Sequence, residues 1–513
     1  MSDPETVDLK IVGGQVVTSA GVRPGLEIAI LAGKIVAMGK APFMPAARRI
    51  IDVKGKYVLP GLVDSEAHPG CYVPFEKDLK SESWEAASVG VTTWGIHSPS
   101  TRLGAEPFQE FVQPEHVLPF SQVIDGAIEI VNRVSAVDVF LTFMLETDAQ
   151  AEEIPLYAEK WGVTSHKLYL QSMRPELDKY WGGRRAGLGH GFDDGTVYLA
   201  MERTAQVGPP AIMCAHMENW QVGRIFEKRL IEAGRTDVGA WTDRSPDFAE
   251  AHHVRSYGYL AKITGCPLYV QHATTSLTYE EILKLRGEGV KVYAQTGPAW
   301  LYLTPENGWR INVPLRRRDH IEKIWEALAS GVIDAVGSDH VIAWDPPTRE
   351  TMYNESIWKL RTGFTSRVGL LTPVMLSEGV NKGRISLERM VEVCCENPAK
   401  IFGLYPKKGA LQVGSDADMV VVDLAKQVKL EKKHLFTRSG WSIAEGHTFN
   451  GWPVMTVLRG KIVSEWPEDS DRPIISGEPT GEYVARVQGQ QNYPVEMHAA
   501  GALRPALASV STK

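Results

Sequence analysis

The stretch Leu59–Gly70, LPGLVDSEAHPG, marks the point at which the pattern of the chain changes. A hydrophobic strand runs into Asp64, and Glu66 and His68 follow at a two-residue spacing. Because successive side chains of an extended strand alternate between its two faces, Glu66 and His68 point the same way. Two potential ligands on one face at the end of a strand predict the beginning of a metal site.

From about residue 59 to 400 the sequence alternates apolar strands, polar loops and amphipathic helices. The predicted strands include VDVFLTFM, GVTSHKLYL, PAIMCAH, CPLYVQH, VKVYAQT and IDAVGSDH. Repeated strand–helix units over such a length predict an α/β fold built on a parallel (β/α)8 TIM barrel.

Both ends of the chain carry short strands separated by glycines. Residues 1–58 contain DLKIVGGQVV and LEIAILAGKIVAMG, and residues 401–465 contain GALQVGSDADMVVVDL and GWPVMTVLRGKIVSE. We expect these two segments to form one small β-sandwich domain beside a barrel of residues 59–400. Residues 466–513, rich in Pro, Gly, Ser and Gln, are expected to form a loosely structured C-terminal arm.

The overall composition narrows the class of partner. The 513 residues include 55 basic and 62 acidic side chains, for a formal charge of −7. This balance argues against broad binding to nucleic acid or anionic membrane and favours a small-molecule substrate. No apolar run is long enough to span a bilayer, and the start MSDPETVDLK lacks a signal-peptide pattern, which favours the cytoplasm. The five cysteines show no CxxC spacing, so neither a disulfide framework nor a zinc ribbon is predicted.

Several potential metal ligands stand at the ends of predicted barrel strands, where the chemistry of such barrels is found. They are Glu66, His68, Lys167, His216, His272 and Asp339. Imidazoles and carboxylates bind transition metals directly, whereas a lysine must first lose its charge, for instance by reaction with CO2 to a carbamate. A single buried histidine is more often a hydrogen-bonded core residue, and a single lysine usually extends to the surface. The metal prediction therefore depends on their joint placement.

These motifs resemble the amidohydrolase superfamily, and within it the hydantoinase/dihydropyrimidinase branch, over roughly residues 7–465. YVLPGLVD is similar to the first-strand signature of the family, GVTSHKLYL to its carboxylated-lysine strand, CAHMEN to its HAEN motif and LYVQHATT to its VHVT-like strand. VGSDH and NPAKIFGLYPKKGALQVGSDADMVVVD also match. The resemblance is specific for the fold and less specific for the substrate.

The resemblance implies a site for two divalent metal ions, Zn2+ or Mn2+. His68, Lys167 and Asp339 would serve one ion, and Lys167, carboxylated by CO2, would serve the second with His216 and His272. A hydroxide would lie between the ions, and Asp339 would act as general base. The implied reaction is the hydrolytic opening of a cyclic amide or imide, carried out by a homo-oligomer, either a dimer or a tetramer.

The sequence departs from the family at several positions. Glu66 replaces the first histidine of a His-x-His pair; its hard oxygen and negative charge should lower the Lewis acidity of the metal and favour Mn2+ beside Zn2+. The alternative is a Glu66 that turns away to pair with an arginine. Ser172 replaces a tyrosine that binds the substrate carbonyl, and Asn312 replaces a serine before Pro-Leu-Arg. Together with Tyr169, which lies near Lys167 in sequence, these are the candidate substrate-binding residues.

The chain has an additional loop after the predicted strand GVTSHKLYL. The loop MRPELDKYWGGRRAGLGHGF would bring Trp181, Arg184 and Arg185 towards the barrel mouth, either as a solvated surface loop or to recognise an aromatic or carboxylate-bearing substrate.

Two functions other than cyclic amide hydrolysis stay open. One alternative is a metal-dependent non-oxidative decarboxylase, because some such enzymes carry Glu-x-His at the end of the first strand. The other is a non-enzymatic hydantoinase-like protein, which bound metal and turnover would exclude.

Overall fold

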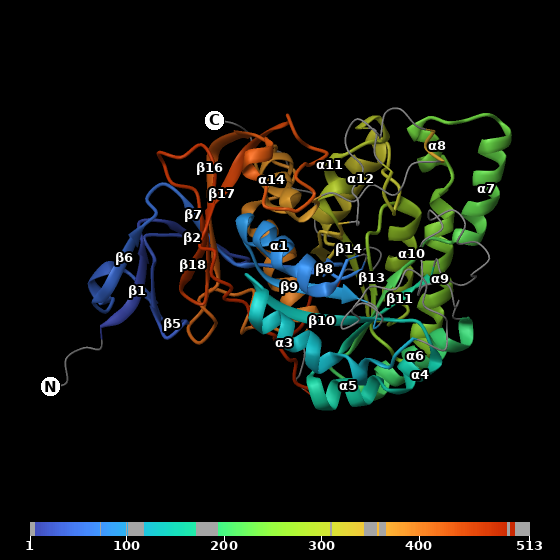
Figure 1. Ribbon diagram of the computed structural model, residues 1–513, viewed down its shortest axis with the longest axis horizontal. Helices are drawn as coiled ribbons and strands as arrows, with labels where there is room; N and C mark the ends of the chain where they lie inside the picture. The colour runs from blue at the N-terminus through green and yellow to red at the C-terminus, as the bar shows by residue number, and fades with distance from the viewer. Residues whose placement is uncertain are drawn as a thin grey trace.

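The computed structural model describes residues 6–71, 73–98, 100, 117–170, 193–307, 310–342, 356–358, 366–489 and 493–497. A barrel of parallel strands surrounded by helices forms the larger part, and sheets from the two ends of the chain lie at its left in Figure 1. In these residues no helix combines the length and the apolar character that a membrane crossing requires.

The barrel strands follow one another around the sheet in chain order. They are β8 (Leu62–Ala67), β9 (Val91–Ser98), β10 (Asp138–Leu145), β11 (Ser165–Tyr169), β12 (Ile212–His216), β13 (Leu268–Val270), β14 (Val292–Thr296) and β15 (Ala335–Val336). The barrel closes after β15, where the Asp339 N–H donates to the Glu66 carbonyl at 2.8 Å and the His68 N–H donates to the His340 carbonyl at 2.7 Å. Closure therefore joins two of the segments that carry predicted ligands.

The strands are buried on both faces because helices cover the outside of the barrel, which explains their nearly continuous apolar sequences. The helices are α1 (Phe75–Ser88), α3 (Ile124–Val134), α4 (Asp148–Glu152), α5 (Ile154–Trp161), α6 (Asp194–Val207), α7 (Trp220–Glu232), α8 (Val238–Asp243), α9 (Asp247–Thr264), α10 (Ser276–Gly287), α11 (Pro298–Tyr302), α12 (Arg318–Ser330), α14 (Leu371–Val374), α15 (Leu387–Val391) and α16 (Asn397–Ile401). Local signals set several helix ends. Asp193 caps α6 by accepting from the N–H groups of Gly195 and Thr196, and α5 ends at Gly162 with a φ of 67°.

The two ends of the chain form two sheets. One has the order β5-β4-β1-β6 and comes wholly from the N-terminal segment: β1 (Val7–Val12), β4 (Glu27–Leu31), β5 (Lys34–Gly39) and β6 (Ala47–Asp52). The other has the order β19-β18-β17-β16-β7-β2-β3 and combines both ends: β2 (Gln15–Thr18), β3 (Gly21–Pro24), β7 (Tyr57–Pro60), β16 (Met419–Lys429), β17 (Thr448–Leu458), β18 (Lys461–Glu465) and β19 (Ile474–Ile475). Val58 pairs with Val421 across this sheet. The predicted barrel with a β domain built from both chain ends is confirmed.

A buried ion cluster ties the barrel to the second sheet. Lys408 Nζ lies 2.8 Å from Asp416 and 2.7 Å from Asp418, and it also pairs with Asp138 at the amino end of β10. The three carboxylates are close enough to hold a cation, but the Lys408 ammonium already lies among them, and Arg459 pairs with Asp138 as well. Because the cluster is at the amino ends of the strands, we assign it to stability rather than to chemistry.

The C-terminal segment also packs against the amino end of the barrel. The Val484 N–H donates to the Val139 carbonyl at 2.7 Å, and the buried guanidinium of Arg486 donates to the Leu141 carbonyl at 2.6 Å and to Ser165 Oγ at 2.7 Å. These bonds bring residues far apart in the sequence to the floor of the barrel.

Candidate metal centre

The predicted ligands meet at the carboxyl end of the barrel. Glu66 and His68 stand at the end of β8, Lys167 lies within β11, His216 ends β12, His272 follows β13 and Asp339 follows β15. All six side chains are buried. The strands are parallel, so their carboxyl ends open at a single mouth, where side chains from separate strands come together.

A first group consists of Glu66, His68 and Asp339, each of which offers one ligand atom within 4.8 Å of the others. His68 Nε2 lies 3.1 Å from Asp339 Oδ1 and 3.7 Å from Glu66 Oε1. On the other side of the ring, His68 Nδ1 lies 3.1 Å from the carbonyl oxygen of His97. This contact favours the tautomer with hydrogen on Nδ1, which leaves the lone pair of Nε2 for a metal.

Lys167 adjoins this group through Glu66. Its Nζ donates to Glu66 Oε1 at 2.7 Å, and Gln295 Nε2 donates to Glu66 Oε2 at 3.0 Å. Burial by itself would raise the pKa of Glu66, but the charges of Lys167 and His272 bring it well below its usual value. Glu66 therefore faces the centre of the site as a carboxylate instead of turning away to an arginine.

A second group consists of His216, His272 and Glu218, again with ligand atoms within 4.8 Å of one another. His216 Nδ1 lies 2.8 Å from His272 Nε2, and His216 Nε2 lies 2.5 Å from Glu218 Oε2. Burial lowers the pKa of His216 to about 4, so that its imidazole is neutral near pH 7, as a metal ligand requires. Sequence reasoning assigned no role to Glu218, although its two-residue spacing from His216 mirrors that of Glu66 and His68.

Asp339 has a cationic partner that the sequence did not indicate. Arg367 Nη1 donates to Asp339 Oδ2 at 2.5 Å, and both side chains are buried. Burial would raise the pKa of Asp339, but the guanidinium charge lowers it below its usual value, so the carboxyl is ionised. Arg367 lies directly before the short helix η7 (Val368–Leu370).

Two of the ligands have strained backbones. The φ angles of His272 and Asp339 are 38° and 49°, in the left-handed region that residues with a Cβ seldom adopt. Strain of this kind persists where surrounding contacts determine the conformation, and it is frequent at functional sites. Here the His272 N–H donates to Gln295 Oε1 at 2.5 Å and the Asp339 N–H donates to the Glu66 carbonyl, so both turns are held by neighbours in the site.

The donor set fits divalent metal ions. The first group combines one imidazole with two carboxylates, and the second combines two imidazoles with one carboxylate. Zn2+ and Mn2+ share these ligand types, and Lys167 adjoins Glu66 of the first group. His272 Nδ1 is buried, and among the described residues it has no hydrogen-bond partner. A buried ring nitrogen without a proton partner is a further sign of a missing ligand.

Two of the three candidate substrate-binding residues, Tyr169 and Asn312, lie in the described part of the chain. The ring of Tyr169 lies 4.5 Å from that of His216, and Lys167 Nζ lies 5.8 Å from the Tyr169 ring, so this side chain borders the ligands. Asn312 is buried in the connection between α11 and α12, beside Arg244. Ser172 and the loop with Trp181, Arg184 and Arg185 lie outside the described residues.

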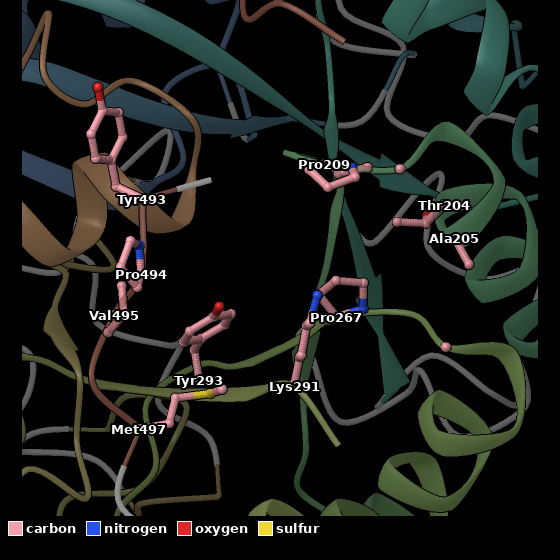
Figure 2. Close-up of a pocket in the computed structure, with 13 residues that line it drawn as sticks. Thr204, Ala205, Pro209, Pro267, Lys291, Tyr293, Tyr493, Pro494, Val495 and Met497 are labelled. Atoms are coloured by element: carbon pink, nitrogen blue, oxygen red, sulfur yellow. The ribbon is translucent and has the colours of Figure 1, made fainter. Parts of the chain in front are cut away.

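The cavity in Figure 2 belongs to the opposite end of the barrel. Its volume is about 480 Å3, and it is lined by Pro267 and Lys291, which precede β13 and β14, and by Tyr493, Val495 and Met497 of the C-terminal arm. The amino ends of barrel strands serve stability rather than catalysis. This cavity is therefore separate from the ligand groups.

The chain is similar to known proteins over most of its length. Residues 252–463 match the model of the Amidohydrolase family. The L-hydantoinase of Paenarthrobacter aurescens is 30% identical over 93% of this chain and 98% of its own, and a D-hydantoinase of Rhizobium radiobacter is 28% identical over 89% and 95%. The solved L-hydantoinase (dihydropyrimidinase) of Arthrobacter aurescens superposes with a TM-score of 0.80 at 27% identity, covering 94% of this chain and 100% of that one. The likeness therefore extends over the barrel and over both end segments.

Proposed function

Because the chain belongs to the hydantoinase-like branch of the amidohydrolase superfamily, we propose that it opens a cyclic amide or imide by metal-dependent hydrolysis of a carbon–nitrogen bond. The observation that carries the proposal is the pair of buried ligand groups at the carboxyl mouth of the barrel. A folded chain rarely buries so many imidazoles and carboxylates together without a functional use.

Each ligand group would hold one ion. Glu66, His68 and Asp339 would bind the first, His216 and His272 would bind the second with Glu218 beside them, and carboxylated Lys167 would bridge the two. Zn2+ or Mn2+ suits these nitrogen and oxygen donors. When bound, the ions acidify a water molecule and polarise the scissile carbonyl.

Carboxylation of Lys167 requires a neutral amine. The Nζ atom must lose a proton before its lone pair attacks CO2, and the second N–H proton then leaves to give a carbamate of charge −1. Glu66 Oε1 lies 2.7 Å from Nζ and is in place to accept the first proton. Lys167 is also buried, which would protect the carbamate from water.

Asp339 is proposed as the general base. It would take the proton from the attacking water and deliver it to the leaving ring nitrogen. Arg367 donates to one carboxylate oxygen of Asp339 and keeps the group ionised, so that Asp339 can accept a proton. Tyr169 and Asn312, together with Ser172, are proposed to position the substrate.

We also propose that the chain forms a homo-oligomer, a dimer or a tetramer. Large apolar side chains are exposed on α6 and α9, two helices that pack against each other: Tyr198 is 41% exposed, Tyr259 55% and Ile263 59%. An exposed apolar surface formed by two packed helices supports association with a second copy of the chain. Light scattering after size exclusion measures the number of subunits.

Metal analysis of the purified protein and a substrate screen test the proposed function. The screen would contain hydantoins, dihydropyrimidines, cyclic imides, lactams and aromatic carboxylates. We expect about two ions per chain and ring opening of at least one cyclic amide or imide. Release of CO2 from an aromatic carboxylate without ring opening would instead indicate a decarboxylase, and a protein that binds no metal and turns over nothing would indicate a non-enzymatic relative.

A further inference from the structure

Two buried arginines lie on the same face of the barrel as the ligand groups. Arg244, 2% exposed, follows α8 in the connection between β12 and α9, and Arg310, 4% exposed, lies in the connection between β14 and α12. Connections that leave the carboxyl ends of strands form the active face of such a barrel. Both guanidinium groups therefore belong to the mouth and not to the floor.

Aromatic rings hold these two cations. The Cζ atoms of Arg244 and Arg310 lie 3.4 Å and 3.9 Å from the centroid of the Trp241 ring, and Trp220 lies 4.1 Å from Arg244. Trp241 Nε1 donates to the Ile311 carbonyl at 2.8 Å, which fixes the ring. Stacking of this kind stabilises a cation while leaving the edge of its guanidinium free to donate hydrogen bonds.

Two of the three guanidinium nitrogens of Arg244 have hydrogen-bond partners among the described residues. Its Nη1 donates to Glu227 at 3.2 Å, and its Nη2 lies 3.4 Å from Asn312 Oδ1. Its Nε is buried and has no acceptor among the described residues, and the same is true of Asn312 Nδ2. The amide orientation of Asn312 is determined because its oxygen, and not its NH2 group, faces the guanidinium. Within the part of the chain that the structure describes, two neighbouring buried donors thus lack acceptors, which is rare in folded proteins.

These two donors indicate which chemical group would bind to them. A guanidinium N–H beside an amide N–H suits the two oxygens of a carboxylate, and the nearby charge of Arg310 favours an anion further. Burial lowers the pKa of Arg244 to about 9, with Glu227 and Glu218 acting in the opposite direction, so the side chain is still cationic near pH 7. Glu218, whose charge acts on Arg244, also contacts His216 of the second ligand group.

We propose that Arg244 and Asn312 form a subsite for a carboxylate carried by the substrate, so that the cyclic amide opened by this enzyme bears an acidic substituent. The inference rests on the proposed function, because it assigns a substrate class to the same site. It also gives a physical reason for Asn312 at a position where the branch carries a serine: the amide supplies an N–H donor that is directed by Arg244.

Two ring substrates that differ only in charge test the subsite. Hydantoin-5-acetic acid and hydantoin-5-acetamide have nearly the same shape, and only the first carries a carboxylate. With the metal-loaded enzyme we expect kcat/KM to favour the acid by ~10- to 100-fold, the value of a charge-assisted hydrogen bond. Arg244→Met should remove this preference through KM. Equal kcat/KM for the two substrates in the unaltered enzyme would overturn the proposal.

Two further variants separate recognition from folding. Asn312→Asp keeps the acceptor for Arg244 but places a negative charge beside the substrate carboxylate, so we expect kcat/KM to fall ~10- to 100-fold further on the acid than on the amide. Arg235→Met is the matched control, because it removes one positive charge from the exposed connection between α7 and α8. If Asn312→Asp lowers kcat/KM equally for acid and amide, the role is structural and the subsite is wrong.

Failure of the proposed function would look different. If the metal-loaded enzyme opens no cyclic amide, that function is wrong, and calorimetric titration with hydantoin-5-acetic acid then decides the subsite by itself. Binding that Asn312→Asp abolishes and Arg235→Met preserves would support it, whereas no binding of the acid to the unaltered protein would overturn it. If neutral hydantoins are opened but the acid has no advantage, the proposed function stands and the subsite does not.

Discussion

Replacing Glu66 by histidine changes the charge of the candidate metal centre by one unit. Glu66 Oε1 lies between the two ligand groups, 3.7 Å from His68 Nε2 and 3.8 Å from His272 Nε2. With Glu66, Asp339, Glu218 and a carbamate at Lys167, four negative charges face the four positive charges of two divalent ions, so the loaded site is about neutral. Glu66→His leaves it with about one positive charge.

The expected magnitude follows from Coulomb's law. A unit charge about 4 Å from the attacking water is worth ~4 kcal/mol at an effective dielectric constant of ~20, and ~1.4 kcal/mol corresponds to one pKa unit. A more positive site stabilises hydroxide, so the pKa of the water falls. Allowing for solvent and for the spread of charge over the ligands, we expect the acid limb of the pH–rate profile to move ~1–2 units lower in Glu66→His.

The assay is kcat/KM against pH for enzyme loaded with a single metal, together with competition between Zn2+ and Mn2+. Because an imidazole is a softer ligand than a carboxylate, Glu66→His should also bind Zn2+ more tightly relative to Mn2+. Glu66→Gln is the matched control, since it removes the charge but keeps an oxygen at the same place. An acid limb that moves by less than ~0.3 unit in both variants would refute the account of Glu66 as a ligand.

Other expectations concern the ligands and the scaffold. Lys167→Ala should lose binuclear metal loading, with partial rescue by formate or acetate; full metal content and rate in this variant would exclude the carbamate bridge. Asp339→Asn should give a folded protein with kcat lower by ~100- to 10,000-fold, and an unchanged kcat would remove it as the base. Glu218→Gln should lower the affinity for the second ion ~10- to 100-fold in a metal titration, and an unchanged affinity would show that Glu218 lies beside the ligands without binding the ion. Lys408→Met leaves three buried carboxylates without the ammonium that pairs with them. We expect the free energy of unfolding, measured by urea denaturation, to fall by ~3–5 kcal/mol, while the folded protein keeps its normal metal content. Stability equal to that of the unaltered protein would contradict the role assigned to the cluster.

Much of the fold could be predicted because its signals are local. Each barrel strand is a short apolar run buried on both faces, and the glycine-punctuated ends pair in one sheet through β7 and β16. Potential ligands could be picked out for the same reason, since a polar residue directly after a buried strand has a defined place at the barrel mouth. Glu218 could have been included, because it follows His216 at the spacing already noted for Glu66 and His68.

The amino-acid sequence by itself determined the barrel, the joining of the chain ends and the strand-end positions from His68 to Asp339, because these depend on periodicity and on the polarity of single residues. Only the tertiary structure decided which side chains pair with one another at the barrel mouth. Arg367 reaches Asp339 from a separate loop, and Arg244 meets Asn312 from a different βα connection, 68 residues away. Such contacts leave no periodic trace, because the conformations of the connecting segments, and not their neighbours in sequence, determine which side chains meet at the mouth.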